Sequence, residues 1–215
     1  MPTVKDYFII LVSLIASAII VWLLYKPIKR LIYTKRYKFI YYRKINKVAH
    51  YEDFYLINRF RLIKDKNNLI TIDHILFGNK WIYLLQDYYF RGILSGKEED
   101  DSWHLDNGKQ KRFITNPLKD NAKFVRLLSK NTQIDENMFI TIGVYNDDLI
   151  LKRVGETLNN NYLTNIKQLP KLIKALEKRE VDTLNEEELE QVVLDLSKLN
   201  SSLDKKDERQ KRSKK

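Results

Sequence analysis

The chain has 215 residues, enough for one domain of roughly 150 residues with an anchor and a tail. Hydrophobic residues make up 44% and charged residues 31%, a balance typical of globular proteins and not of disordered chains. The chain contains no cysteine, which excludes disulfides and thiolate metal sites, and its net charge of +11 favours anionic partners such as nucleic acid or an anionic lipid surface.

An uncharged apolar stretch occupies residues 7–25. As a helix with a rise of ~1.5 Å per residue it would span roughly 28 Å, close to the ~30 Å hydrocarbon core of a bilayer. Tyr7, Trp22 and Tyr25 stand near its ends, where aromatic rings favour the headgroup zone. A buried core helix would show a polar stripe, and the cleavage-like residues 16–18 of a signal peptide lie inside the apolar stretch itself. The sequence therefore predicts a transmembrane anchor.

A strongly basic segment follows at residues 26–47, which hold nine lysines and arginines and no acidic residue. Because cytoplasmic flanks of membrane helices are rich in Lys and Arg, this bias predicts that the rest of the protein lies in the cytoplasm. The segment could lie on anionic headgroups or bind nucleic acid, and its proximity to the bilayer favours headgroups. The side chains expected to contact lipid or nucleic acid are Lys35, Arg36, Lys38, Arg43, Lys44 and Lys47.

The body of the chain combines strand and helix patterns, which predicts an α/β (α+β) protein. The expected strands are residues 59–64, 69–77, 80–90, 138–145 and 149–154, with another hairpin around residues 106–108 and a loop that contains Gly92 and Gly96. One expected helix ends near residue 54. Three more are expected at residues 116–130, 169–178 and 185–200. The predicted organisation is an anchor at 1–26, a basic juxtamembrane segment at 27–47, a folded domain at 48–200 and a basic disordered tail at 201–215.

Three segments of the folded domain occur in the order of a known family. Residues 72–75 (Ile-Asp-His-Ile) lie on an expected strand, Trp103 follows the loop that begins at Gly96, and residues 116–118 (Asn-Pro-Leu) open an expected helix. Together they resemble the nuclease-related domain (NERD) family over residues 48–200. The resemblance implies a restriction-endonuclease-like mixed sheet flanked by helices, and many members of this family also carry an N-terminal membrane segment.

That family is similar to the PD-(D/E)xK nucleases, which hold Mg²⁺ with an Asp and a second acidic residue and use a lysine near the attacking water. Asp73 matches the metal-binding Asp. The expected Glu-x-Lys falls on Gln86 and Tyr88, which supply neither a charged ligand nor an ammonium group near neutral pH. The resemblance thus implies Asp73, Gln86 and Tyr88 as the catalytic positions and Asp73 as the metal position, in a degenerate site. Mg²⁺ is expected only in an active enzyme, and no other cofactor is expected.

Other side chains could compensate for the missing carboxylate. Asp87 should face the opposite side of its strand from Gln86, because no glycine signals a bulge there. Glu52 and Asp53 are more typical of a solvated helix face. His74 is expected to be a hydrogen-bonded side chain and not a ligand. The sequence contains no GxSxG, HExxH or Gly-rich phosphate loop, and with three histidines and no cysteine a zinc site would need carboxylates.

Three functions are open at this point. The first is a catalytically inactive module at the cytoplasmic membrane face that binds DNA, RNA or a protein partner. The second is an active Mg²⁺-dependent membrane-bound nuclease with rearranged ligands. The third is a membrane-side structural or interaction protein with no role in nucleic-acid binding. Because two of the three groups that the reaction requires are replaced, the residues favour the first.

Overall fold

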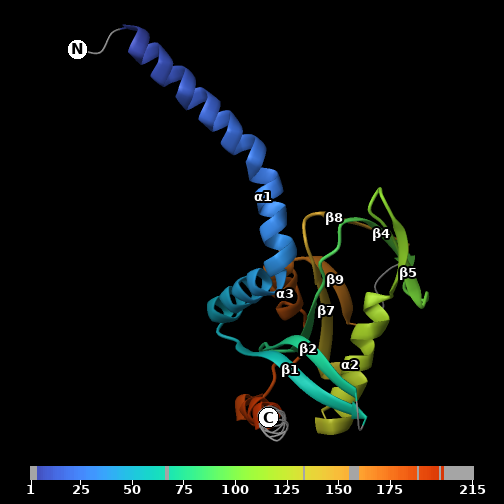
Figure 1. Ribbon diagram of the computed structural model, residues 1–215. Helices are drawn as coiled ribbons and strands as arrows, with labels where there is room; N and C mark the ends of the chain where they lie inside the picture. Colours follow the sequence, from blue (N-terminus) through green and yellow to red (C-terminus); the bar gives the residue numbers. More distant parts are fainter. Residues whose placement is uncertain are drawn as a thin grey trace, which may run out of the picture. The chain divides into compact units, whose positions relative to one another are not determined.

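The computed structural model describes residues 4–65, 68–132, 134–154, 160–187, 189–198 and 200 (Figure 1). The predicted tail at residues 201–215 lies outside these ranges. Contacts divide the chain into two compact units, Met1–Ile40 and Tyr41–Lys215, which we describe separately. The second unit contains both sheets and the residues expected at the site.

Helix α1 (Val4–Glu52) provides the described part of the first unit and the beginning of the second. It passes through Pro27, and Arg36 departs from helical geometry with φ −129° and ψ 18°. Among the described residues, one helix is long and apolar enough to cross a membrane, and it covers Tyr7–Glu52. Its large apolar side chains between Tyr7 and Ile32 are exposed, Trp22 by 72% for example. This part of the helix therefore has no apolar partner among the described residues of its own unit.

Five strands of the second unit form the first sheet, in the order β1-β2-β3-β7-β9. They are β1 (Tyr55–Asp65), β2 (Asn68–Phe77), β3 (Ile82–Asp87), β7 (Phe139–Tyr145) and β9 (Asn161–Asn165). β1, β2 and β3 are antiparallel neighbours, whereas β3 with β7 and β7 with β9 are parallel. The central strands are rich in apolar and β-branched residues and are buried, as strands covered on both faces should be.

A second sheet has the order β6-β5-β4-β8. Its strands are β4 (Gly92–Lys97), β5 (Ser102–Asp106), β6 (Lys111–Thr115) and β8 (Leu149–Val154). β4 follows β3 in the chain, β8 follows β7, and β4 and β8 are again parallel neighbours. The buried Asn146 lies between β7 and β8, and Phe90 lies between β3 and β4. Asn146 Oδ1 accepts a hydrogen bond from the Phe90 backbone N–H at 3.0 Å, which ties these two connections together. The paired central strands therefore pass together from one sheet into the other.

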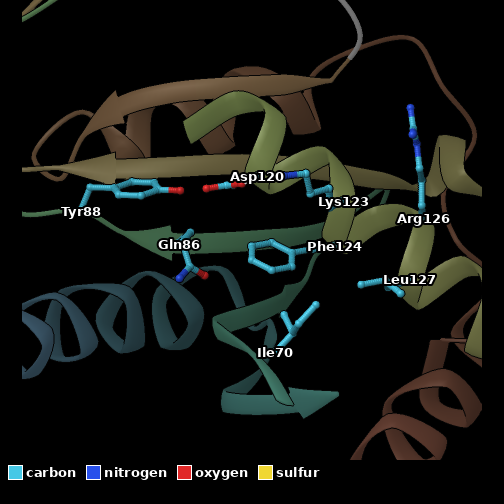
Figure 2. A pocket seen from close by; sticks show the side chains of 8 residues that line it. All are labelled: Ile70, Gln86, Tyr88, Asp120, Lys123, Phe124, Arg126 and Leu127. Atoms are coloured by element: carbon cyan, nitrogen blue, oxygen red, sulfur yellow. Dashed lines mark hydrogen bonds and ion pairs between the residues drawn. The ribbon is translucent and has the colours of Figure 1, made fainter. Parts of the chain in front are cut away.

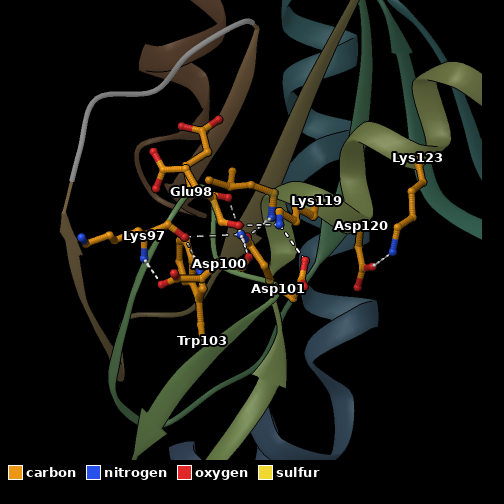
Figure 3. A network of polar contacts seen from close by, with 11 residues as sticks. Lys97, Glu98, Asp100, Asp101, Trp103, Lys119, Asp120 and Lys123 are labelled. Atoms are coloured by element: carbon orange, nitrogen blue, oxygen red, sulfur yellow. Dashed lines mark hydrogen bonds and ion pairs between the residues drawn. The ribbon is translucent and has the colours of Figure 1, made fainter.

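The connection between β4 and β5 is acidic and is tied to the next helix (Figure 3). The side-chain amide of the fully buried Asn116 donates to the carbonyl oxygens of Glu98 and Asp100, both at 2.8 Å. Lys119 forms an ion pair with Asp101 at 2.7 Å. These contacts fix the hairpin β4–β5 against the start of helix α2 (Pro117–Thr132).

The main core lies between the first sheet and the helices. The buried Leu84 and Ile72 of the sheet belong to one apolar cluster with Leu128 of α2 and with Leu196, and residues 189–198 are helical. A short 3₁₀ helix, η1 (Glu136–Met138), precedes β7, and α3 (Leu169–Glu177) carries Pro170 in its first turn. The last turns of α1 bury Tyr41 and Ile45 completely.

The predicted mixed α/β class is confirmed, with two mixed sheets and helices, although two strands were not expected. The predicted loop with Gly92 and Gly96 is wrong, because it is strand β4. Gly96 leaves room for the ring of the buried Trp103, because a Cβ at this position would lie 2.3 Å from Trp103 Cδ1. Strand β9 begins and ends with asparagine, a residue that disfavours strands. It is a strand because it pairs with β7, which its own sequence does not predict.

Candidate functional site

Strands β2 and β3 bring Asp73 and Gln86 together. The pairing of His74 with Leu85 places Asp73 beside Gln86. The backbone N–H of Asp73 donates to Gln86 Oε1 at 3.3 Å, and Asp73 Oδ2 accepts a hydrogen bond from the Asp87 backbone N–H at 3.0 Å. Asp73 is only 4% exposed, so its carboxylate is held inside the sheet by contacts with β3.

Tyr88 directly follows β3 and packs under the first turns of α2. Its hydroxyl lies 3.2 Å from the side-chain amide of Asn121, and its ring stacks on Phe90 at a centroid distance of 5.7 Å. Gly143 of β7 leaves room for this ring, since a Cβ there would lie 3.1 Å from Tyr88 Cε2. Burial raises the pKa of the Tyr88 phenol, and the negative charges of Asp120 and Asp73 raise it further. The phenol is therefore neutral at physiological pH.

A pocket of about 530 Å³ opens above Gln86 and Tyr88 (Figure 2). Helix α2 supplies Asp120, Lys123, Phe124 and Leu127, whose spacing of three and four residues puts them on one face of the helix. Lys123 forms an ion pair with Asp120 at 3.0 Å, and the Tyr88 hydroxyl is directed toward Asp120. The complete lining is Ile70, Gln86, Tyr88, Asp120, Lys123, Phe124, Arg126 and Leu127.

The α2 side of this pocket was not expected from the sequence. The sequence predicts a helix over residues 116–130, and its apolar Leu118 and Leu128 are buried. The charged Asp120, Lys123 and Arg126 lie between these apolar positions, where their pattern is also that of a solvated face. Only the position of α2 over β3 shows that they line a cavity.

The side chains of this site do not fit Mg²⁺. That ion requires near-octahedral oxygen ligands at about 2.0–2.1 Å. Among the residues that the structure describes, no group of three His, Asp or Glu side chains could hold a metal ion. Gln86 is uncharged, Asp120 is paired with Lys123, and one oxygen of Asp73 accepts the Asp87 N–H.

The remaining acidic candidates lie elsewhere. Asp87 is buried and its Oδ2 lies 3.1 Å from His74 Nε2, while Nδ1 of the same ring lies 2.6 Å from Asn58 Oδ1. Both nitrogens of His74 therefore have a hydrogen-bond partner, and alternation along β3 directs Asp87 away from Gln86 and Tyr88. Glu52 lines a different pocket, of about 440 Å³, and Asp53 is exposed.

The six basic residues expected to contact lipid or nucleic acid lie along α1. Lys35, Arg36 and Lys38 are exposed in the first unit. In the second unit Arg43 and Lys47 are exposed and Lys44 is half-buried, and Lys44 and Lys47 line the same pocket as Glu52. Their contact with lipid or nucleic acid stays a prediction, as do the catalytic roles of Asp73, Gln86 and Tyr88.

The comparison with known families agrees with the order of motifs. A family model described as the nuclease-related domain matches residues 37–146, just over half of the chain. The matched range contains β1 to β6, α2 and β7, and with them the whole lining of the pocket above Gln86 and Tyr88. No curated protein and no solved structure matches the chain.

Proposed function

The chain belongs to the nuclease-related domain family, and on this basis we propose that it is a membrane-anchored module that binds nucleic acid at the cytoplasmic membrane face without cleaving it. The observation that carries this proposal is the composition of the pocket above Gln86 and Tyr88. The pocket contains two cations that can hold a phosphate, Lys123 and Arg126. At the two positions where the resemblance to metal-dependent nucleases implies a carboxylate ligand and a lysine, it contains Gln86 and Tyr88.

The loss of cleavage is argued from chemistry. In-line attack on a phosphodiester needs a metal ion that polarises the phosphate and a base that activates water. A glutamine amide cannot neutralise a divalent cation. Tyr88 remains a neutral phenol, because burial and two carboxylates disfavour its ionisation, and it therefore cannot replace an ammonium group.

Binding is supported by the cations on α2. Arg126 is exposed and the Lys123 side chain is 61% exposed, so both can reach a ligand from solvent. Lysine and arginine contacts with phosphates supply most of the non-specific affinity for nucleic acid, because each contact releases condensed counterions. The net charge of +11 acts in the same direction over the whole chain.

The location is supported by α1. Its apolar part is long enough to cross a bilayer, and the basic residues that follow favour a cytoplasmic position for the second unit. A protein partner at the same membrane face is the alternative, and it would account for an anchored module that shows no affinity for nucleic acid.

The test uses the full chain in nanodiscs of zwitterionic lipid, incubated with supercoiled plasmid and either Mg²⁺ or Mn²⁺. We expect a shifted band and no nicked product. The double variant Lys123→Ala, Arg126→Ala should weaken binding and lower the slope of log affinity against log salt by about 1.8. The double variant Lys171→Ala, Lys174→Ala, on the exposed face of α3, is the matched control.

Two outcomes contradict the proposal. Nicking that depends on metal and disappears in Asp73→Ala would establish an active nuclease with rearranged ligands. Absence of binding at low salt would leave a protein partner, or a purely structural role at the membrane, as the function.

A further inference from the structure

The second sheet presents an ordered grid of side chains on one of its faces. Residues directly opposite each other on paired strands point to the same side of a sheet. The pairings Phe113 with His104, His104 with Ser95, and Ser95 with Lys152 therefore form one row across all four strands. The neighbouring row is Lys111, Asp106, Ile93 and Ile150.

This face is open, whereas the opposite face is packed. Trp103 and Leu105, which alternate with His104 and Asp106 on β5, are buried in a cluster with Leu118 of α2. None of the eight residues of the two rows is buried. Phe113 is 75% exposed on the edge strand β6, and Ile150 is 59% exposed on the edge strand β8. Two large apolar side chains are thus presented to solvent at opposite edges of one sheet face.

The chemistry of the surface combines aromatic rings with cations. The rings of Phe113 and His104 are in contact at a centroid distance of 5.6 Å and an interplanar angle of 65°, and Phe113 remains mostly exposed. Lys111 and Lys152 occupy the two edge strands, and the exposed Lys97 lies at the end of β4. The acidic member, Asp106, is offset by an ion pair with Lys111 at 3.8 Å and accepts the Gly108 N–H.

We propose that this open face of the second sheet, the two rows from Phe113 to Lys152 and from Lys111 to Ile150, binds single-stranded nucleic acid. A base stacks on Phe113 and the strand crosses the sheet, with its phosphates beside Lys111 and Lys152. Strands lie ≈ 4.8 Å apart, so the edge strands are about 14 Å apart. Four-stranded sheets with exposed aromatic side chains bind two or three unstacked bases on a face of this size.

The geometry selects unpaired bases over a duplex. Stacking on Phe113 requires a base whose face is free, and a duplex hides every base face except at its ends. The surface is separate from the pocket above Gln86 and Tyr88, because it shares no residue with that pocket. In the acidic connection between β4 and β5, Asn116 binds the backbone carbonyl oxygens of Glu98 and Asp100, and Lys119 pairs with the carboxylate of Asp101.

The experiment measures fluorescence anisotropy of a labelled oligothymidylate, and of a duplex of the same length, with the full chain in zwitterionic nanodiscs. We expect Phe113→Ala to weaken binding of the oligothymidylate by roughly ten- to hundredfold and to leave duplex binding unchanged. Tyr51→Ala removes an aromatic side chain that is 80% exposed outside the sheet, and it should change neither. The double variant Lys111→Ala, Lys152→Ala should lower the salt slope for the oligothymidylate by about 1.4.

The outcomes separate this inference from the proposed function. If the oligothymidylate does not bind, or binds Phe113→Ala as tightly as the unaltered chain, the open face is not a nucleic-acid surface. Equal losses for duplex and single strand in Phe113→Ala would also overturn it. If plasmid binding depends on Lys123 and Arg126 but not on Phe113, Lys111 or Lys152, the proposed function stands and this inference fails. Thermal unfolding of each variant checks that its fold is intact.

Discussion

At the scale of single residues, Tyr88 illustrates how a neighbourhood fixes a protonation state. Its phenol lies under α2, beside Asn121, and carboxylates on both β2 and α2 raise its pKa beyond the effect of burial. Gln86 adds an amide that accepts the backbone N–H of Asp73. Both residues thus make structural contacts, at the two positions where the sequence resemblance implies a metal ligand and a lysine.

Restoring both groups tests this interpretation. We expect the double variant Gln86→Glu, Tyr88→Lys to nick supercoiled plasmid in Mg²⁺, while each single variant stays inactive, because metal binding and water activation are both required. Adding Asp73→Ala should abolish the nicking and serves as the control. A folded double variant that never nicks would mean that the bond between Asp73 Oδ2 and the Asp87 N–H also prevents metal binding.

Glu177 gives a prediction about pH. Its Oε1 accepts a hydrogen bond from the Tyr83 hydroxyl at 2.5 Å, but burial is the larger influence and raises the pKa of the Glu177 carboxyl. A raised folded-state pKa means that the contribution of Glu177 to stability is complete below its unfolded pKa and is lost as the pH rises through its folded pKa.

The variant Glu177→Gln keeps an acceptor for Tyr83 and removes the charge. We expect its stability to equal that of the unaltered chain at acidic pH and to exceed it by up to about 1 kcal/mol at neutral pH, because solvent screens this half-buried group. Thermal unfolding of both proteins across the pH range measures the difference. A difference that does not change with pH would contradict this assignment.

At the scale of elements, the sequence predicts best those helices and strands whose secondary structure is determined by neighbouring residues in the chain. The runs of apolar and β-branched residues in β2 and β3, and the single apolar face of α2, are properties of consecutive residues. β4 and β9 depend on partners far along the chain, since β4 pairs with β8 and β9 with β7. For the same reason Asp73, Gln86 and Tyr88 could be assigned from the order of motifs, while Lys123 and Arg126 required the position of α2.

The connection between the sheets gives a prediction at this scale. The side chain of Asn146 is 2% exposed and its Oδ1 holds the Phe90 N–H. We expect Asn146→Ala to lower the free energy of unfolding by roughly 1–3 kcal/mol, because the partly buried Phe90 N–H loses its acceptor. Urea unfolding measures this loss. Asn131→Ala, at an exposed side chain that bonds to the Leu127 carbonyl oxygen, is the matched control and should cost much less.

At the scale of the whole molecule, the boundary of the folded unit lies inside α1. Contacts place it after Ile40, and the family model begins at residue 37. Tyr41 and Ile45 are completely buried, and Tyr41 donates a hydrogen bond to the Tyr88 carbonyl oxygen at 3.3 Å. A domain that begins at residue 48, as the composition of the sequence suggested, would lack both side chains.

This difference can be measured on shortened chains. We expect a protein of residues 41–215 to unfold cooperatively, and one of residues 48–215 to be less stable by at least about 3 kcal/mol, since each lost side chain removes about 1.5–3 kcal/mol of apolar burial. Urea unfolding of both gives the comparison. The double variant Tyr41→Ala, Ile45→Ala in the longer protein should reproduce most of the loss. Equal stability of the two proteins would place the boundary at residue 48.

The passage of two paired strands from one sheet into the other has a consequence for synthesis on the ribosome. β3 and β4 are made early, but their parallel partners β7 and β8 belong to residues 139–154, which emerge only after α2. Until then each incomplete sheet has an unpaired edge that can associate with other chains. Both edges are closed by the same short segment, so a pause in translation just before residue 139 exposes two sites of aggregation at once.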